Sequence, residues 1–280
     1  MAADERIRPA PKFPARGGKR QQDPEPPKID DIAPKDGFLN WRDLELDPAV
    51  TGFPAAPAWW TRARDVDAAA VIAGDQKDRF IYYDALGEYA PKLAADWTKT
   101  GVKLRNDSSD DFAAVMAVRV KDGVCSSATA RLAQGGSAEL ALTKGLPDLA
   151  AALAGLYKKE AAALVEIWND EFFKTDGVRL LAVLARDVYD RLLPVDISPK
   201  PDELVRVLIL HLECLDDDRV ATIKAWIEDL ASGEIETRDV AARKLRELGP
   251  LAEPMIRAAA EKTTDAEARA RLTELLPRKK

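Results

Sequence analysis

Residues 219–276 read RVATIKAWIEDLASGEIETRDVAARKLRELGPLAEPMIRAAAEKTTDAEARARLTELL, and this stretch decides the fold expected for the C-terminal part of the chain. Apolar residues recur at intervals of three and four in four short runs, which predicts four amphipathic helices. Gly249-Pro250 separates the second run from the third, and Thr264 with Glu267 has the pattern of a capping box before the fourth. The four apolar stripes are Val220, Ile223, Ile227 and Leu230; Ala241, Leu245 and Leu248; Leu251, Met255 and Ala259; and Leu272, Leu275 and Leu276.

Short helices of this kind stack into solenoids, where each repeat contacts only its neighbours and about three or more repeats are needed for stability. Because the pattern does not recur elsewhere in the chain, we expect the apolar faces to rest on another surface. The preceding residues 168–213 are the candidate within this chain, so we predict that residues 216–280 alone would fold poorly. We expect the outer ridge of the helices to bind another protein through Arg243, Arg246, Glu247 and Arg257.

The stretch before the helices, residues 146–215, mixes helical and extended patterns and predicts an α+β body. Residues 149–173 have helical spacing, as two helices or as one kinked near Gly155, and residues 177–185 have the composition of a buried strand. Residues 204–214 fit either a helix or a strand. Their β-branched first half and a possible pairing with residues 177–185 favour the strand.

Residues 38–145 have the pattern of a small antiparallel β-sandwich, because short extended runs alternate with turn signals. Asp122-Gly123 between two such runs predicts a hairpin. The strand and turn pattern resembles the Ig-like modules of bacterial surface proteins, which implies adhesion or spacing, although residues 85–97 would fit a helix. The aromatic residues at 38–60 predict an irregular strap held to this domain by its rings. The expected strands are 79–83, 102–105, 114–120, 124–132 and 138–142.

Residues 1–37 contain seven prolines and the basic run RGGKR at 16–20, which predicts a disordered or extended tail. The whole chain is thus expected to be an α+β multidomain protein, with an N-terminal β-sandwich, a central α+β body and a C-terminal HEAT-like helical unit. No apolar run approaches the roughly 20 residues that a transmembrane helix needs. As written, the N-terminus has no signal peptide, so we expect a cytoplasmic protein, or an exported one if a signal was removed.

Composition excludes several classes of site. The net charge is -6, from 42 basic and 48 acidic residues in mixed clusters, which argues against nucleic-acid binding. His211 is the only histidine, so one chain cannot build a zinc site from two or three imidazoles. Cys125 and Cys214 have no metal-knuckle or disulfide-framework spacing, although a single disulfide between them remains open. We therefore expect no cofactor.

The residues best suited to chemistry lie in the central body, where strand pairing would gather them. Arginines beside carboxylates can hold an anionic ligand, and His211 and Glu213, two apart on one strand face, can share proton transfer. On a regular strand, however, Arg206 points to the opposite face. The alternative is a set of structural ion pairs. The candidates are Arg179, Arg186, Asp190, Arg206, His211 and Glu213.

Short motifs in two stretches point to a family. The first stretch holds Trp168, FF at 172–173, Gly177, RLL at 179–181, LLP at 192–194, Pro199, Pro201 and VRV at 205–207, and the second holds AARKL at 241–245 and LGPLAEP at 248–254. They resemble uncharacterised proteins of environmental bacteria with large genomes, several of which carry the second stretch as a HEAT-like segment. The resemblance implies no established activity, and it implies export for many relatives.

Two functions fit these patterns. The first is a non-catalytic interaction or scaffold protein that docks through its C-terminal helical unit. The alternative is a hydrolase or an anionic-ligand-binding enzyme that uses the Arg, Asp and His residues of the central body. The two differ in whether those side chains converge on one cleft.

Overall fold

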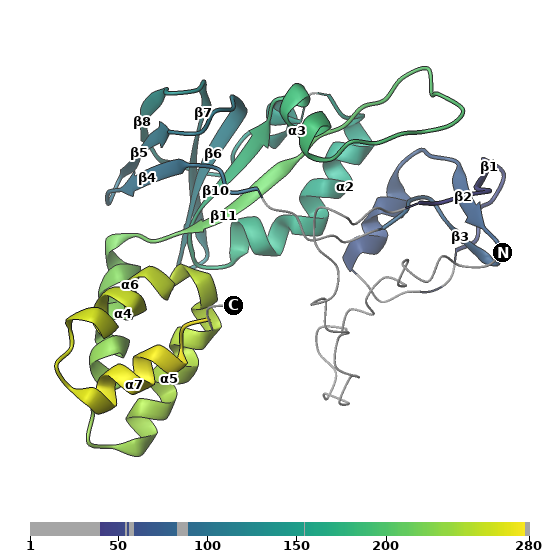
Figure 1. The fold of residues 1–280 in the computed structure, drawn as a ribbon. Coiled ribbons are helices and arrows are strands. Elements are labelled where there is room, and N and C mark those ends of the chain that lie inside the picture. The colour runs from purple at the N-terminus through teal and green to yellow at the C-terminus, as the bar shows by residue number, and fades with distance from the viewer. Residues whose placement is uncertain (1–39, 54, 56–58, 83–88, 154, 278–280) are drawn as a thin grey trace. The chain divides into compact units, whose positions relative to one another are not determined.

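A computed structural model describes residues 40–53, 55, 59–82, 89–153 and 155–277 (Figure 1). The expected tail at residues 1–37, and the side chains of Trp59 and Trp60 in the expected strap, lie outside what is described. The described residues form helices and three antiparallel sheets, so the α+β class is confirmed. The chain divides into two compact units, residues Met1–Pro91 with Leu149–Asn169, and Lys92–Asp148 with Asp170–Lys280. No helix in the described ranges is long and apolar enough to span a bilayer.

The first unit combines a small sheet of order β1-β2-β3 with helical segments. Contacts between η3 and α2 include an ion pair of Arg62 Nε with Glu166 Oε1 at 3.0 Å. Lys159 Nζ of α2 also lies 2.6 Å from Asp67 Oδ1. The elements are β1 (Glu45–Asp47), the 3-10 helix η3 (Trp59–Asp65), β2 (Ala70–Ala73), β3 (Gln76–Asp78), α1 (Leu149–Ala152) and α2 (Lys158–Asn169).

Two arginine side chains of this unit contact Phe53, one aromatic residue of the expected strap. The Phe53 ring centroid lies 5.6 Å from the guanidinium carbons of both Arg64 and Arg79, which is cation–π geometry. Arg64 in turn makes a two-point ion pair with Asp78 at 3.0 and 2.7 Å. Phe53 therefore lies in the first unit, whereas we had expected the strap on the β region.

The strand expected at residues 79–83 does not form over its described part, residues 79–82. The carboxylate of Asp78 accepts a hydrogen bond from the Arg79 backbone N–H at 2.8 Å. The Arg79 Nη1 group donates to the carbonyls of Arg64 and Val66, both at 2.9 Å. These local bonds compete with a strand ladder, so the chain bends after β3.

The second unit contains a five-stranded sheet of order β11-β10-β6-β7-β9 and a three-stranded sheet of order β4-β5-β8. The strands expected at 102–105, 114–120, 124–132 and 138–142 are confirmed as β5 to β8, the last ending one residue earlier. The helix considered for 85–97 is wrong in its described C-terminal half, because residues 93–97 pair with β5. The strands are β4 (Leu93–Trp97), β5 (Gly101–Asn106), β6 (Phe112–Lys121), β7 (Val124–Leu132), β8 (Ser137–Ala141), β9 (Thr143–Lys144), β10 (Gly177–Leu184) and β11 (Ile209–Cys214).

The hairpin predicted at Asp122-Gly123 joins β6 to β7, with Lys121 paired to Val124. Both turn residues have positive φ, 51° for Asp122 and 71° for Gly123. A two-residue turn with two left-handed residues matches the twist of the flanking strands, and Asp-Gly tolerates this conformation well. The local sequence thus sets the register of the two longest strands.

The five-stranded sheet crosses the domain boundary that we expected at residue 145. β10 pairs with β6 on one side, as in Arg179 with Val118, and with β11 on the other, as in Arg179 with Glu213. The β region and the central body are therefore one sheet rather than two bodies. β6 and β10 lie inside the sheet and are buried almost throughout, so they lack the alternation that marks a strand with one wet face.

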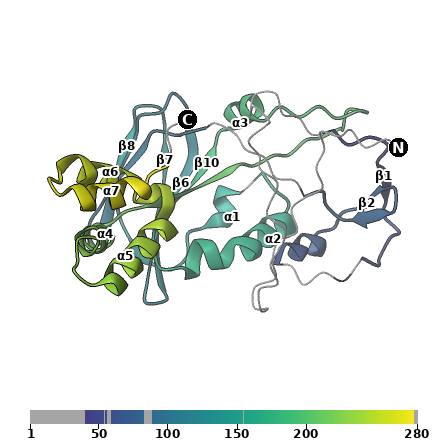
Figure 2. The ribbon, with the colours of Figure 1, turned by 60° about the horizontal axis from the view of Figure 1, so that its bottom comes forward.

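Four α-helices and one short 3-10 helix form the C-terminal part, and Figure 2 shows α4 to α7 gathered together. The Asp216 side chain caps α4 by accepting the Arg219 N–H at 3.0 Å. The capping box at Thr264 is wrong, because Asp265, directly before α7, accepts the Glu267 N–H instead at 2.9 Å. The helices are α4 (Asp217–Asp229), α5 (Ile235–Leu248), η5 (Gly249–Leu251), α6 (Glu253–Lys262) and α7 (Ala266–Glu274).

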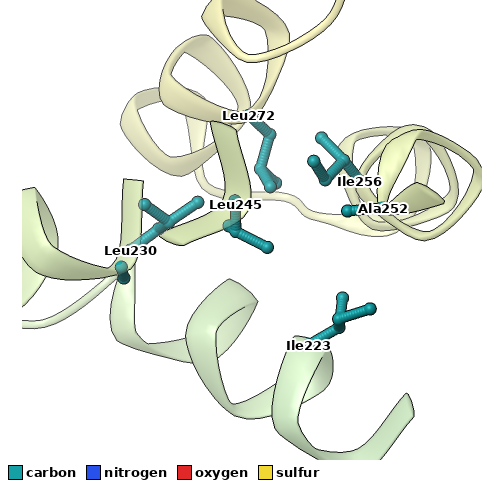
Figure 3. Close-up of a cluster of buried hydrophobic side chains, with 7 residues drawn as sticks. Ile223, Leu230, Leu245, Ala252, Ile256 and Leu272 are labelled. Carbon is teal, nitrogen blue, oxygen red and sulfur yellow. The ribbon is translucent and has the colours of Figure 1, made fainter. Parts of the chain in front are cut away.

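The apolar faces of these helices pack on one another (Figure 3). The fully buried residues here are Ala252, directly before α6, and Ile256 within it, one position beyond the expected Leu251 and Met255, because η5 has a tighter turn and shifts the helical phase. Every residue of this core, including its partly buried rim, lies between Leu215 and Leu276. The apolar faces therefore pack on one another rather than on the separate surface that we expected. The buried residues are Ile223, Leu230, Ala241, Leu245, Ala252, Ile256 and Leu272.

Candidate functional site

The six residues expected to form an anion site lie in two groups. Arg179, His211 and Glu213, which we call the Arg179 cluster, lie on β10 and β11. The other three, which we call the Arg206 cluster, are Arg186 and Asp190 on α3 (Arg186–Leu192) and Arg206 in the segment before β11. Among the described residues, no hydrogen bond or ion pair joins one group to the other.

The Arg179 cluster is built around a completely buried guanidinium. Arg179 lies opposite Glu213 across the β10–β11 pair, and its Nε donates to Glu213 Oε1 at 2.7 Å. Its Nη1 donates to the Phe172 carbonyl at 2.9 Å, and its Nη2 to the Thr175 carbonyl at 2.8 Å. The Arg179 side chain is 0% exposed. All three nitrogens have partners, which is what a buried charge requires in order to be stable.

The two carbonyls that Arg179 binds belong to a π-helical turn and its exit. This turn, η4 (Asp170–Lys174), follows α2 and ends where the Thr175 N–H and hydroxyl both bond the Asp170 carbonyl, at 3.0 and 2.9 Å. Its Phe172 and Phe173 are buried, with ring centroids 5.8 Å apart. Carbonyls at a helix end need partners from outside the helix. Arg179 supplies them, a role that the sequence did not reveal because nothing in it marks a π turn.

His211 and Glu213 lie on one strand face, as expected, with His211 Nε2 2.8 Å from Glu213 Oε1. The His211 ring also meets the Phe172 ring edge-on, at 5.2 Å between centroids. Burial by itself would raise the pKa of Glu213, but the hydrogen bonds from His211 and Arg179 outweigh burial and leave the pKa below its usual value. A carboxylate with a lowered pKa is a poor proton acceptor, so Glu213 serves better as a counter-ion than as a general base.

The Arg206 cluster fixes the long segment between α3 and β11, drawn in green in Figure 1. Arg206 Nη1 lies 2.6 Å from Asp190 Oδ1, and its Nη2 donates to the Leu193 carbonyl at 2.5 Å. Tyr189 donates its hydroxyl hydrogen to the Arg206 carbonyl and stacks its ring 5.3 Å from the guanidinium. Arg186 Nε reaches the other oxygen of Asp190 at 3.3 Å.

These contacts also shorten the strand that we expected at residues 204–214. Only Ile209–Cys214 pairs with β10, so the strand prediction is confirmed for its second half. Residues 204–208 are not part of a strand. The side chain and carbonyl of Arg206 are both used in holding α3, which replaces the ladder contacts of a regular strand.

A hollow of about 540 Å³ lies beside this segment, but most of the six candidate residues do not line it. Of the six residues, only Arg186 lines it. Its other lining residues come from the loop itself and include Val195, Ile197, Lys200 and Glu203. The side chains expected to act together therefore do not meet in this hollow.

Metal and thiol chemistry find little support in the described part of the chain. No group of three or more His, Cys, Asp and Glu side chains there is arranged to hold a metal ion. The disulfide left open by the sequence is not formed, because Cys125 and Cys214 are both free thiols. Burial raises the pKa of Cys214 to about 11, which keeps this thiol protonated and unreactive.

The expected partner ridge lies on α5 and α6. Arg243, Arg246 and Glu247 are exposed on α5. Arg257 of α6 is only half exposed and donates through Nη2 to Glu253 Oε1 at 2.6 Å. The exposed part of the ridge is therefore a feature of one helix.

Comparison of the chain with protein-family models, with curated proteins and with solved structures found no match. The resemblance to proteins of environmental bacteria, and the likenesses to HEAT-like and Ig-like modules, stay predictions.

Proposed function

We propose that this chain is a non-catalytic protein-binding or scaffold protein that docks through the outer face of α5. The observation that supports the proposal is that α4 to α7 bury their apolar faces against one another. The outer face of α5 does not contribute to this core. Val240 is 39% exposed on this face, and Arg243 and Glu247 follow it at helical spacing.

The composition of the face suits protein recognition. Arginine is enriched at protein interfaces, because its planar group makes several directed hydrogen bonds while its stem packs on apolar surface. Arg243 and Arg246 are both exposed and lie one turn apart on α5. An exposed valine with Arg243 one turn further on offers a small apolar spot beside charged groups, and the two exposed arginines favour a partner with an acidic surface.

The alternative, an enzyme that uses the central body, has less support. Arg179 is fully buried with each of its nitrogens engaged, and Arg206 holds a loop to α3. Structural ion pairs of this kind can shift pKa values without taking part in a reaction. No contact seen in the two clusters favours a catalytic role over a structural one.

The test is affinity capture from the native source, followed by titration of the captured protein against purified variants. Arg243→Glu combined with Arg246→Glu reverses the charge of the ridge, and we expect at least a tenfold weaker binding. The control is Lys224→Glu, a charge reversal at another exposed position, on α4. Equal binding by the wild-type chain and the double variant, with unchanged melting temperatures, would contradict the proposal. So would an equal loss in the control.

A further inference from the structure

The strand β11 is the last strand of the five-stranded sheet, and among the described residues it pairs with β10 alone. The Leu184 N–H donates to the Leu208 carbonyl at 3.2 Å, so the backbone groups of residue 208 point toward β10. Backbone groups alternate in direction along a strand. Those of Leu210, Leu212 and Cys214 therefore also face β10, and those of Ile209, His211 and Glu213 face outward, where a further strand can bond to them.

This edge lacks several of the features by which proteins block strand addition. Prolines, lysines, bulges and very short strands protect most edges. The six residues of β11, ILHLEC, contain no proline or lysine, and their pairing with β10 runs from Val178 to Val183 without a register shift. Leu210 and Leu212 are also only half-buried. A strand laid against this edge would gain both hydrogen bonds and apolar contact.

The sequence of β11 is complementary to itself in the antiparallel direction. We infer that β11 pairs with the β11 strand of a second copy of this chain, with Leu212 on the twofold axis, so that two sheets join into one. In this register His211 lies opposite Glu213 of the partner subunit, and Glu213 lies opposite the partner subunit's His211. A histidine ring N–H directly across from a carboxylate can donate a hydrogen bond to it, and polar pairs of this kind across two strands stabilise their pairing.

The other face of the joined strands is complementary as well. Leu212 meets its own copy across the axis, and Leu210 meets Cys214 of the partner subunit. A register with His211 on the axis satisfies the backbone equally well, but it sets His211 against itself and Ile209 against Glu213. The side chains therefore select the register centred on Leu212, and they select a second copy over an unrelated strand.

The first test measures the mass of the full chain by sedimentation equilibrium up to about 100 µM, since small interfaces give weak dimers. We expect a concentration-dependent dimer. His211→Glu sets two carboxylates opposite each other and should weaken the dimer at least tenfold, whereas His211→Lys sets a donor opposite Glu213 of the partner subunit and should retain it. Glu139→Lys, on the edge strand β8 of the other sheet, is the control and should leave the dimer unchanged.

The second test determines the register between the two β11 strands directly and does not depend on the side chain at position 211. In a chain with Cys125→Ser and Cys214→Ser, Leu212→Cys should form a covalent dimer on mild oxidation, because a pair on the axis has the Cα separation of a disulfide. Leu210→Cys in the same background faces Ser and should not. A monomer at all concentrations, a dimer that His211→Glu leaves intact, or cross-linking at 210 instead of 212 would each overturn the inference.

Discussion

The β10–β11 region and the α4–α7 unit solve the problem of burial in different ways. The helical unit fills its core with apolar residues that lie close in sequence, between Leu215 and Leu276. The sheet region places a charged side chain at its centre, and Arg179 reaches Glu213 over 34 positions of sequence. An apolar core tolerates small changes of shape, whereas a buried charge depends on every partner. We expect the two regions to differ accordingly when single residues are removed.

The largest effect should come from Arg179→Ala. This change leaves the carboxylate of Glu213 without its main counter-charge and the Phe172 and Thr175 carbonyls without a donor. Breaking a buried ion pair by removing one partner costs about 3–5 kcal/mol. Unfolding in urea would measure the loss. The control is Arg105→Ala, whose ion pair with Asp107 is exposed and should contribute less than about 1 kcal/mol. Equal losses of unfolding free energy in the two variants would show that Arg179 contributes no more than an exposed ion pair.

Leu245→Ala should have the next largest effect, because Leu245 is 1% exposed in the core of the helical unit. Truncating a buried leucine costs about 2–5 kcal/mol, depending on how far the cavity collapses. The matched control on the same helix is Val240→Ala, which is exposed and should change the free energy of unfolding by less than about 0.5 kcal/mol. Denaturant unfolding followed by helical circular dichroism measures both. A small effect at Leu245 would mean that the core is loosely packed.

The Arg179 cluster should make stability depend on acid. The pKa of Glu213 is lower in the folded chain than its ordinary value of 4.5, because hydrogen bonds from His211 and Arg179 outweigh the opposing effect of burial. The stabilisation is therefore fully present above about pH 4.5 and is lost as the pH falls through the folded pKa. The difference in unfolding free energy between the wild-type chain and Glu213→Gln should shrink below that pH. A difference that stays constant from pH 7 to pH 3 would rule out this role for Glu213.

The cap of α7 should give a smaller effect that separates two adjacent residues. Asp265 accepts the Glu267 N–H, so Asp265→Ala should cost about 1 kcal/mol, while Thr264→Ala should cost almost nothing. Thermal melting of the two variants side by side makes the comparison. The reverse order would restore Thr264 as the capping residue.

The smallest change is expected when the helical unit is separated from the rest of the chain. Since its core draws only on residues between Leu215 and Leu276, residues 215–277 should keep their helical content and melt cooperatively. This reverses the behaviour expected from the repeat pattern alone. A fragment without a cooperative transition by circular dichroism would show that the unit needs another surface after all.

The elements that the sequence predicted well are those with a local physical signal. The Asp122-Gly123 turn formed as predicted because its backbone preference lies in two adjacent residues. The four C-terminal helices formed because amphipathic spacing is a property of one helix. The rotation of α6 about its axis differed from the prediction, because a short 3-10 turn before the helix moved its buried face by one residue.

The candidate site was predicted in part. His211 and Glu213 share a strand face, as a period of two requires, and Arg179 joins them. Arg206 was expected on the opposite face of the same strand, but it lies outside the strand and binds Asp190. Whether six charged residues form one site or two depends on where a strand begins, which was not evident from their spacing.

By itself, the sequence determined the class of the protein, the hairpin and the positions of the C-terminal helices, because these follow from turn preference and apolar periodicity over a few residues. Only the tertiary structure decided that β10 and β11 join the sheet of β6 and β7, that four helices suffice to bury their own faces, and that Arg179 lies inside. Each of these outcomes depends on contacts between distant segments. Such contacts are set by the free energy of the whole packed arrangement, which no short stretch of sequence contains.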